Sequence, residues 1–171
     1  VPLRGHVAGV PETGRDGRLD VVGWLARNGV PAGAVVGLGL VPNAQMGALL
    51  REAHVGLFPN RCEGGTNLVA MECMASGVPV VLSANTGHLD LVAEDRCWPL
   101  LAQGAALPTA QFAGVEGWGE SDVDEILAAL EALYAGREEA ERRARNAAGF
   151  MRDLTWSARI DHLLALLGDL L

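Results

Sequence analysis

The feature that most constrains this chain is the alternation of short apolar runs with segments of helical spacing. The apolar runs lie at residues 35–41, 55–58, 79–82 and 97–100. A short run of this kind, without charged residues, is typical of a strand that is buried on both faces of a sheet. Because strands that alternate with helices are joined by right-handed crossovers, the pattern predicts an α/β fold with a parallel sheet.

Residues that favour helix starts precede the segments of helical spacing. Their side-chain oxygens accept hydrogen bonds from the free N–H groups of the first helical turn. Glycines follow several of these segments, where a left-handed backbone ends a helix. We therefore predict helices at 21–28 after Asp20, at 44–53 after Asn43, from Thr66 to about Ser76, and from Asn85 or Thr86 to about Val92.

After residue 101 the pattern changes to helices only. Apolar residues recur at helical spacing, and serine or threonine residues stand where N-caps are expected. We predict three C-terminal helices: one from a capping box of Ser121 and Asp124 to Gly136, a charged one at 137–154 with an alanine-rich inner face, and one capped by Thr155.

The domain organisation follows from the length and from the glycine-rich segments. Residues 1–20 lack an apolar period and predict a loop or a frayed start, and the linker at 101–120 is rich in glycine and alanine. There is no internal repeat. A length of 171 residues fits a single domain, 1–171, whose C-terminal helices occupy 121–171.

The charge of the chain narrows its partners. The net charge is −8, and there are 13 arginines but no lysine. Because phosphate neutralisation supplies most of the affinity for nucleic acids and anionic membranes, we expect neither as a partner. No apolar run approaches the ~20 residues of a membrane span. Three cysteines do not make a disulfide framework and favour a reducing, cytoplasmic location.

The segment 60–66 has the features of a ligand-binding turn. A predicted strand ends at Phe58, two glycines follow at 64–65, and a helix starts near Thr66. Parallel α/β sheets bind ligands at the carboxyl ends of their strands. The free N–H groups there, up to Asn67 and Leu68, and the helix dipole attract an anion such as a diphosphate. The alternative is that the glycines only make a tight turn.

Two carboxylates favour the ligand-binding interpretation. Glu63 lies in the turn, and Glu72 lies on the helix among apolar neighbours. A buried carboxylate without a partner is costly, and the vicinal hydroxyls of a ribose are two donors that it accepts together. The alternative for Glu72 is a hydrogen bond to a neighbouring backbone group or a position facing solvent.

The stretch 58–81, FPNRCEGGTNLVAMECMASGVPVV, resembles the donor-site signature of the family 4 retaining glycosyltransferases. Looser similarity includes 39–53, 87–92 and the Leu-Thr-Trp at 154–156, so that the resemblance covers about 30–168. These enzymes have the two-domain GT-B fold. The resemblance implies a Rossmann-like sheet with helices on both faces, the C-terminal half of that fold, followed by a C-terminal helical segment. We expect the acceptor-binding N-terminal domain of that fold to be absent from the chain.

The resemblance also implies roles for individual residues. Glu72 matches the glutamate that holds the nucleotide ribose, and Glu63 resembles the catalytic-site glutamate that contacts the donor sugar. The donor-binding set further comprises the turn amides of Gly64, Gly65, Thr66, Asn67 and Leu68, the loop at Val41 where the base rests, and two candidates, Arg61 and His88, for contacts to phosphate or sugar.

Two departures from the family pattern concern this site. Eight residues separate Glu63 from Glu72 where the family usually has seven, so either the turn is longer or Gly64 takes the first position. The family's arginine and lysine pair, which neutralises the diphosphate, has no match. Arg61 is a possible substitute or a solvated loop residue, and His88 is a ligand contact or a plain surface or capping residue.

The implied activity is the transfer of a sugar from a nucleotide diphosphate sugar, with retained configuration, to a sugar, lipid or protein acceptor. The resemblance also implies that no cofactor and no metal are needed. The Asp122 and Asp124 pair has the spacing that metal-dependent glycosyltransferases of another fold use, but it lies in the first turn of a predicted helix, where acids complement the dipole. The isolated chain is expected to be inactive, and its exposed apolar surface allows a homodimer. The alternatives are a degenerate GT-B-like binding or scaffold module and, less favoured, a nucleotide-sugar epimerase.

Overall fold

The computed structural model describes residues 20–34, 36, 38, 41–109 and 112–168. The chain divides into two compact units, 1–42 and 43–171. The first unit contains the helix α1 (Val21–Arg27) and the short 3₁₀ helix η1 (Ala32–Ala34). As predicted, Asp20 caps α1, since its Oδ1 accepts a hydrogen bond from the Gly23 N–H at 2.9 Å.

Two of the sequence predictions for the first unit lie wholly or partly outside the described residues. The loop predicted at 1–20 falls outside them up to residue 19. In the strand predicted at 35–41, residues 36, 38 and 41 are described and none of them is in a strand. Residues 35, 37, 39 and 40 of that strand are not described.

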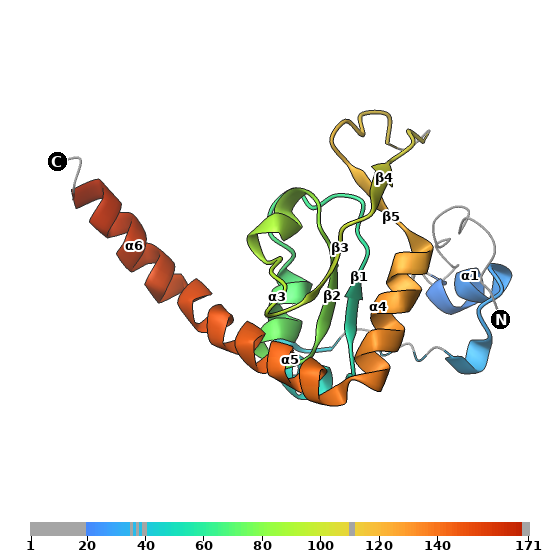
Figure 1. Ribbon diagram of the computed structural model, residues 1–171, viewed down its shortest axis with the longest axis horizontal. Helices are drawn as coiled ribbons and strands as arrows, with labels where there is room; N and C mark the ends of the chain where they lie inside the picture. Colours follow the sequence, from blue (N-terminus) through green and yellow to red (C-terminus); the bar gives the residue numbers. More distant parts are fainter. Residues whose placement is uncertain (1–19, 35, 37, 39–40, 110–111, 169–171) are drawn as a thin grey trace. The chain divides into compact units, whose positions relative to one another are not determined.

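The second unit is built on a three-stranded parallel sheet, as the sequence predicts. After the helix α2 (Asn43–Leu50), the strands are β1 (Gly56–Phe58), β2 (Val80–Ser83) and β3 (Trp98–Leu100), in the order β1-β2-β3 (Figure 1). Residue 56 pairs with 80 and residue 81 with 98. Among the described strands β1 is therefore an edge, and its Leu57 is exposed rather than buried.

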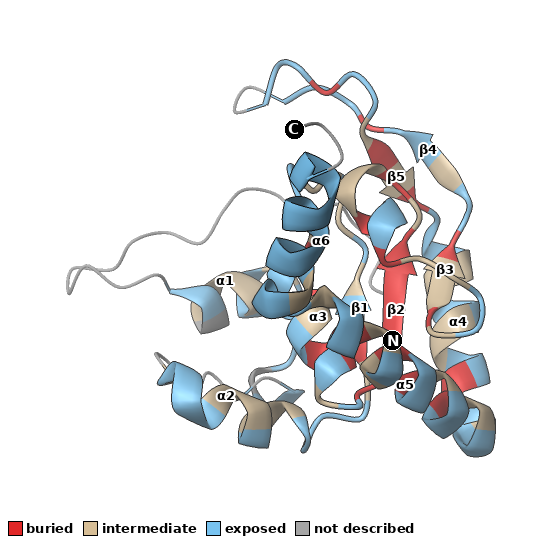
Figure 2. Cartoon of the chain, turned by 90° about the vertical axis from the view of Figure 1, so that its left-hand side faces the viewer, coloured by how far each residue is buried: buried red, intermediate tan, exposed pale blue. Residues whose placement is uncertain are grey.

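Helices cover both faces of this sheet. The helices α3 (Leu68–Ala75) and α5 (Arg137–Met151) pack on one face, where Val80 and Leu82 of β2 join their core cluster. The intervening residue of β2 points to the other face and packs against α4 (Val123–Ala135). Figure 2 shows β2 as the fully buried strand at the centre of the unit. The side-chain alternation of a strand thus supplies apolar groups to two separate cores.

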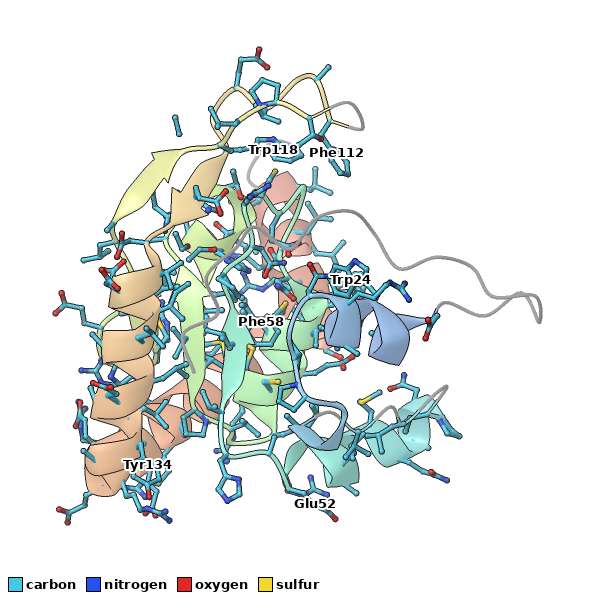
Figure 3. The ribbon with its side chains drawn as sticks, turned by 90° about the vertical axis from the view of Figure 1, so that its right-hand side faces the viewer. Trp24, Glu52, Phe58, Phe112, Trp118 and Tyr134 are labelled. Atoms are coloured by element: carbon cyan, nitrogen blue, oxygen red, sulfur yellow. The ribbon has the colours of Figure 1, made fainter. Side chains whose placement is uncertain are left out.

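The prediction that only helices follow residue 101 is wrong. The strands β4 (Gln103–Ala105) and β5 (Gly119–Ser121) form a two-stranded antiparallel sheet. Their connection carries Phe112 and Trp118, whose ring centroids lie 5.7 Å apart (Figure 3). The strands are short and poor in β-branched residues, so the local sequence carries no strand signal. The Gly119 N–H donates a hydrogen bond to the carbonyl of residue 61 at 2.9 Å, so a residue far away in the sequence holds β5 in place.

The start of α4 also differs from the prediction. Ser121 ends β5, and Asp122 is the N-cap, with its Oδ1 accepting from the Glu125 N–H at 2.9 Å. The two Glu125 oxygens accept the N–H groups of Leu101 and Ala102, each at 2.9 Å. The Asp122 and Asp124 pair therefore belongs to the first turn of a helix, as expected.

The last helices follow the predicted pattern. Three alanines of α5 are buried, and the short 3₁₀ helix η3 (Arg152–Leu154) leads to α6 (Trp156–Gly168). Thr155 accepts a hydrogen bond from the N–H of residue 158 at 3.3 Å, so it caps α6. Trp156 is 85% exposed, and Leu163, Leu164, Leu166 and Leu167 of α6 are exposed as well. Across the described residues, every helix is too short or too polar to span a bilayer.

Gly77 gives a test of the α3 to β2 connection. It follows α3 with φ of +75°, a conformation that costs about 1–2 kcal/mol for a residue with a Cβ. We expect Gly77→Ala to lower the free energy of unfolding by about that amount. Gly149→Ala, in open space on α5, should raise it by up to about 1 kcal/mol. Denaturant titrations of both variants measure this difference, and equal effects would contradict the assignment.

Candidate functional site

The candidate site is the turn between β1 and α3, at the carboxyl edge of the sheet. Phe58, labelled in Figure 3, is the last residue of β1, and α3 starts at Leu68. The predicted N-cap, Thr66, is wrong by one residue. Asn67 is the cap, because its Oδ1 accepts a hydrogen bond from the Ala70 N–H at 3.0 Å. The Thr66 hydroxyl lies 3.4 Å from an oxygen of Asp90 instead.

The turn presents a row of backbone N–H groups without acceptors. From Gly64 to Val69, no backbone N–H donates to another residue of the described part of the chain. The first turn of any helix leaves such groups unpaired, and the helix dipole adds a partial positive charge there. A Cβ on Gly64 or Gly65 would meet nothing within 4 Å, so both glycines face open space. The arrangement fits an anionic ligand that approaches the backbone closely.

Glu63 is held in this turn by four hydrogen bonds. Its N–H donates to the Thr86 hydroxyl at 2.8 Å, and its carbonyl accepts the Gly87 N–H at 3.3 Å. Its Oε1 accepts the amide groups of Asn60 at 2.5 Å and of Asn67 at 3.0 Å. Its Oε2 has no hydrogen bond to any residue that the structure describes. One carboxylate oxygen is thus fixed by the protein, and the other is left for a donor from outside.

His88 is buried and does not face the ligand side of the turn. Its side chain is 0% exposed, with Nδ1 3.1 Å from the Ser83 carbonyl and Nε2 3.0 Å from the Asn67 amide nitrogen. Its Nε2 also lies 4.0 Å from Oε1 of Glu63. Burial lowers the pKa of His88, and the Ser83 carbonyl and the Glu63 carboxylate offset that shift only in part. Because His88 is fully buried, the structure contradicts both the expected contact of its side chain to phosphate or sugar and the alternative of a surface residue.

The segment after β2 packs directly on the turn. It contains the 3₁₀ helix η2 (Thr86–Asp90), where the sequence predicted a longer helix. A Cβ on Gly87 would overlap the carbonyl oxygen of Gly65, so the two backbones are in contact. Thr86 has a φ of +38°, which is uncommon for a residue other than glycine. The close approach leaves no room for any side chain at position 87.

Three residues that the sequence analysis missed complete this arrangement. The Asn60 carbonyl accepts the Ser83 hydroxyl at 2.7 Å and the Asn85 amide at 2.9 Å. The Asn85 amide also reaches the Gln103 oxygen of β4 at 2.9 Å. Asn60 comes shortly after β1, and Ser83 and Asn85 end or follow β2, so polar residues at the carboxyl ends of two neighbouring strands were the available signal.

Arg61, the nearest cation to the glycines in sequence, is paired within the protein. Its Nε forms an ion pair with Glu120 of β5. Both side chains are a little under half exposed, so the pair contributes little to stability. To replace the family's arginine and lysine pair at the diphosphate, Arg61 would have to leave Glu120 or interact with both groups at once.

Glu72 lies on the exposed face of α3, which corrects the expectation of a buried carboxylate. Leu68 and Val69 share that face and are 69% and 56% exposed, whereas Cys73 and Met74 turn into the core. The Glu72 carboxylate has no ion pair or hydrogen bond among the described residues. It is therefore open to solvent or to a ligand. Val41, predicted to lie near the base, belongs to the first unit, so its place relative to this turn is not described.

Comparison with known proteins places the chain among glycosyltransferases. A family model described as "Family 4 Glycosyltransferase in conflict systems" matches residues 42–163. Two solved structures share the fold: sucrose-phosphate synthase from Thermosynechococcus elongatus (TM-score 0.64, 19% identity) and Anabaena Alr3699/HepE in complex with UDP (TM-score 0.63, 17% identity). Each match covers 87% of this chain but only 34% and 35% of those proteins. None of the curated proteins matches the sequence.

The contact between Gly87 and Gly65 gives a test of the site's construction. In Gly87→Ala the new methyl group has to displace the backbone of the turn, so we expect the free energy of unfolding to fall by about 1–3 kcal/mol. Gly64→Ala faces open space and should change it by less than about 0.5 kcal/mol. Thermal unfolding of the two variants measures the difference. A Gly87→Ala variant as stable as Gly64→Ala would show that the two segments are not packed as described.

Proposed function

The chain belongs to the family 4 glycosyltransferases in conflict systems, and from this we propose that it binds the nucleotide-sugar donor of a retaining glycosyl transfer. The solved structures that share its fold have GT-B architecture, and the match covers only about a third of each of them. The chain corresponds to one part of such an enzyme, the donor-binding half. The acceptor, a sugar, lipid or protein, would be held by residues outside it.

The observation that carries this proposal is the row of unpaired N–H groups between Gly64 and Val69. A diphosphate needs several donors at close range, and this turn offers them without a side chain in front of the glycines. The chain as a whole is acidic, with a net charge of −8. Attraction for a dianion therefore has to be local, and oriented backbone N–H groups with a helix dipole are the available source.

The two glutamates suit the other parts of a nucleotide sugar. Glu72 lies four residues beyond Leu68, about 6 Å along the helix axis. Its exposed carboxylate is suited to the two ribose hydroxyls of a nucleotide whose diphosphate rests on the helix start. Glu63 comes directly before these N–H groups in the chain, and its Oε2 would accept a hydroxyl of the donor sugar.

In this proposal the chain contributes to catalysis by positioning the donor and by stabilising negative charge. The departing diphosphate would gain charge against the N–H groups of α3, which is the electrostatic contribution that such groups make best. No metal is expected to take part. The remaining positive charge would come from residues outside the described turn, because Arg61 is paired with Glu120.

A second candidate is a binding or scaffold module that has lost catalysis. The observation that favours it is the lack of an unpaired cation in the turn 60–67, in a chain without lysine. Such a module would not bind nucleotide even in the full-length protein, whereas a donor-binding half would. The cytoplasmic location, the absence of a nucleic-acid partner and a possible homodimer remain predictions from the sequence.

The proposal predicts that Glu72→Gln weakens nucleotide binding. Losing one charged hydrogen-bond acceptor for the ribose should lower the affinity about tenfold. The measurement is calorimetric titration of the chain with UDP, GDP and ADP, using the nucleotide that binds most tightly. The matched control is Glu131→Gln, an exposed glutamate on α4, which should bind like the wild type. Unchanged affinity in Glu72→Gln would refute the ribose contact.

A further inference from the structure

The buried imidazole of His88 has a defined tautomer. Its Nδ1 lies 3.1 Å from the Ser83 carbonyl oxygen, which can only accept a hydrogen bond. Nδ1 must therefore carry a proton. The Ser83 hydroxyl, 3.0 Å from the same nitrogen, is free to accept as well, because its own hydrogen is directed to the Asn60 carbonyl at 2.7 Å.

The other ring nitrogen then fixes the side chain of Asn67. In the neutral ring Nε2 is an acceptor, and the Asn67 amide donates to it at 3.0 Å. The second hydrogen of that amide goes to Oε1 of Glu63 at 3.0 Å. The Asn67 oxygen accepts the Ala70 N–H. Rotating the amide by half a turn would set an oxygen against two acceptors and lose the helix cap, so one orientation is favoured.

The surroundings keep this ring neutral. His88 is fully buried, and burial lowers its pKa. The charged group that acts on it is Glu63 in the turn, while its contacts on β2 and α3, Ser83 and Asn67, are uncharged. Asp90 lies on the same 3₁₀ helix as His88, but its carboxylate is 3.4 Å from the Thr66 hydroxyl and is not a hydrogen-bond partner of the ring. A second proton on the ring would place an N–H against the amide hydrogens of Asn67.

We propose that His88 is a positioning residue for the donor sugar. As the neutral Nδ1–H tautomer it orients Asn67, which in turn holds Oε1 of Glu63 and leaves Oε2 for one sugar hydroxyl. This inference rests on the proposed function, because it assigns the free oxygen to the sugar of a nucleotide-sugar donor. It concerns recognition of the sugar, because the partners in this chain of hydrogen bonds are side-chain atoms of Asn67 and Glu63 and not the backbone N–H groups proposed for the diphosphate.

The tautomer is tested first, without any ligand. Nitrogen-15 NMR of the imidazole in the wild-type chain should show a protonated Nδ1 and an unprotonated Nε2 at pH 7. The ring should gain its second proton only at a pH below the range of an exposed histidine. A protonated Nε2, or titration in the ordinary range, would overturn the hydrogen-bond assignment and the inference with it, whatever the chain binds.

Sugar recognition is tested with two variants of His88. His88→Asn keeps a donor for Ser83 but loses the acceptor for Asn67, whereas His88→Gln places an amide oxygen near the position of Nε2. Each variant is titrated with UDP and UDP-glucose, GDP and GDP-mannose, and ADP and ADP-glucose. The quantity compared is the ratio of the affinity for the nucleotide sugar to the affinity for the matching diphosphate, for the pair that the wild-type chain binds. In His88→Asn this ratio should fall about fivefold. His88→Gln should restore most of it.

A further variant separates positioning from folding. Asn67→Ser retains a capping oxygen for α3 but removes both amide hydrogens, so it should lose the sugar preference as His88→Asn does. Equal losses for the diphosphate and the sugar form in all variants would indicate a merely structural role and overturn the inference. An unchanged preference would overturn it too. If the wild-type chain binds none of the six ligands, the proposed function fails, and the tautomer measurement still decides the hydrogen bonds.

Discussion

The hydrogen bonds of one buried imidazole hold the carboxyl edge of this sheet together. His88 joins the end of β2, through Ser83, to the cap of α3, through Asn67. Leaving a buried polar group unpaired costs about 1–3 kcal/mol, so separating these segments would be unfavourable in free energy. The contact between the backbones of Gly87 and Gly65 adds a steric limit to the same arrangement. The segment that follows β2 therefore supports the turn before α3 and restricts its shape.

This construction leaves the other side of the turn free for a ligand. The side chains that hold the turn point inward, while the N–H groups from Gly64 to Val69 and one oxygen of Glu63 remain without partners among the described residues. Glu72 joins them because the core takes the opposite face of α3. An acidic chain can in this way present a local site for an anion, since the attraction comes from oriented backbone groups rather than from net charge.

The sequence predicted the features that depend on local pattern. It did not predict those that depend on contacts between residues far apart in the chain. The parallel strands and most helix ends follow from apolar spacing and capping residues, and the helices on both faces were implied by the resemblance to the family. The strand at Gly119 does not, because a bond to the carbonyl of Arg61 holds it. Thr66 and Asn67 are both good caps by sequence, and the structure has Asn67 as the cap, with its amide hydrogen-bonded to His88, a residue of another strand connection. The turn itself was predicted, but the residues that support it were not.

The central claim is that the N–H groups before and within the first turn of α3 bind a nucleoside diphosphate. The measurement that tests it most directly is a titration of the chain with UDP, GDP and ADP, following the backbone amide shifts by NMR. The account predicts saturable shifts that centre on Gly64–Val69 for at least one nucleotide, with little change in α5. Saturable shifts that centre elsewhere on the sheet, or no shift in this segment with any of the three, would contradict it.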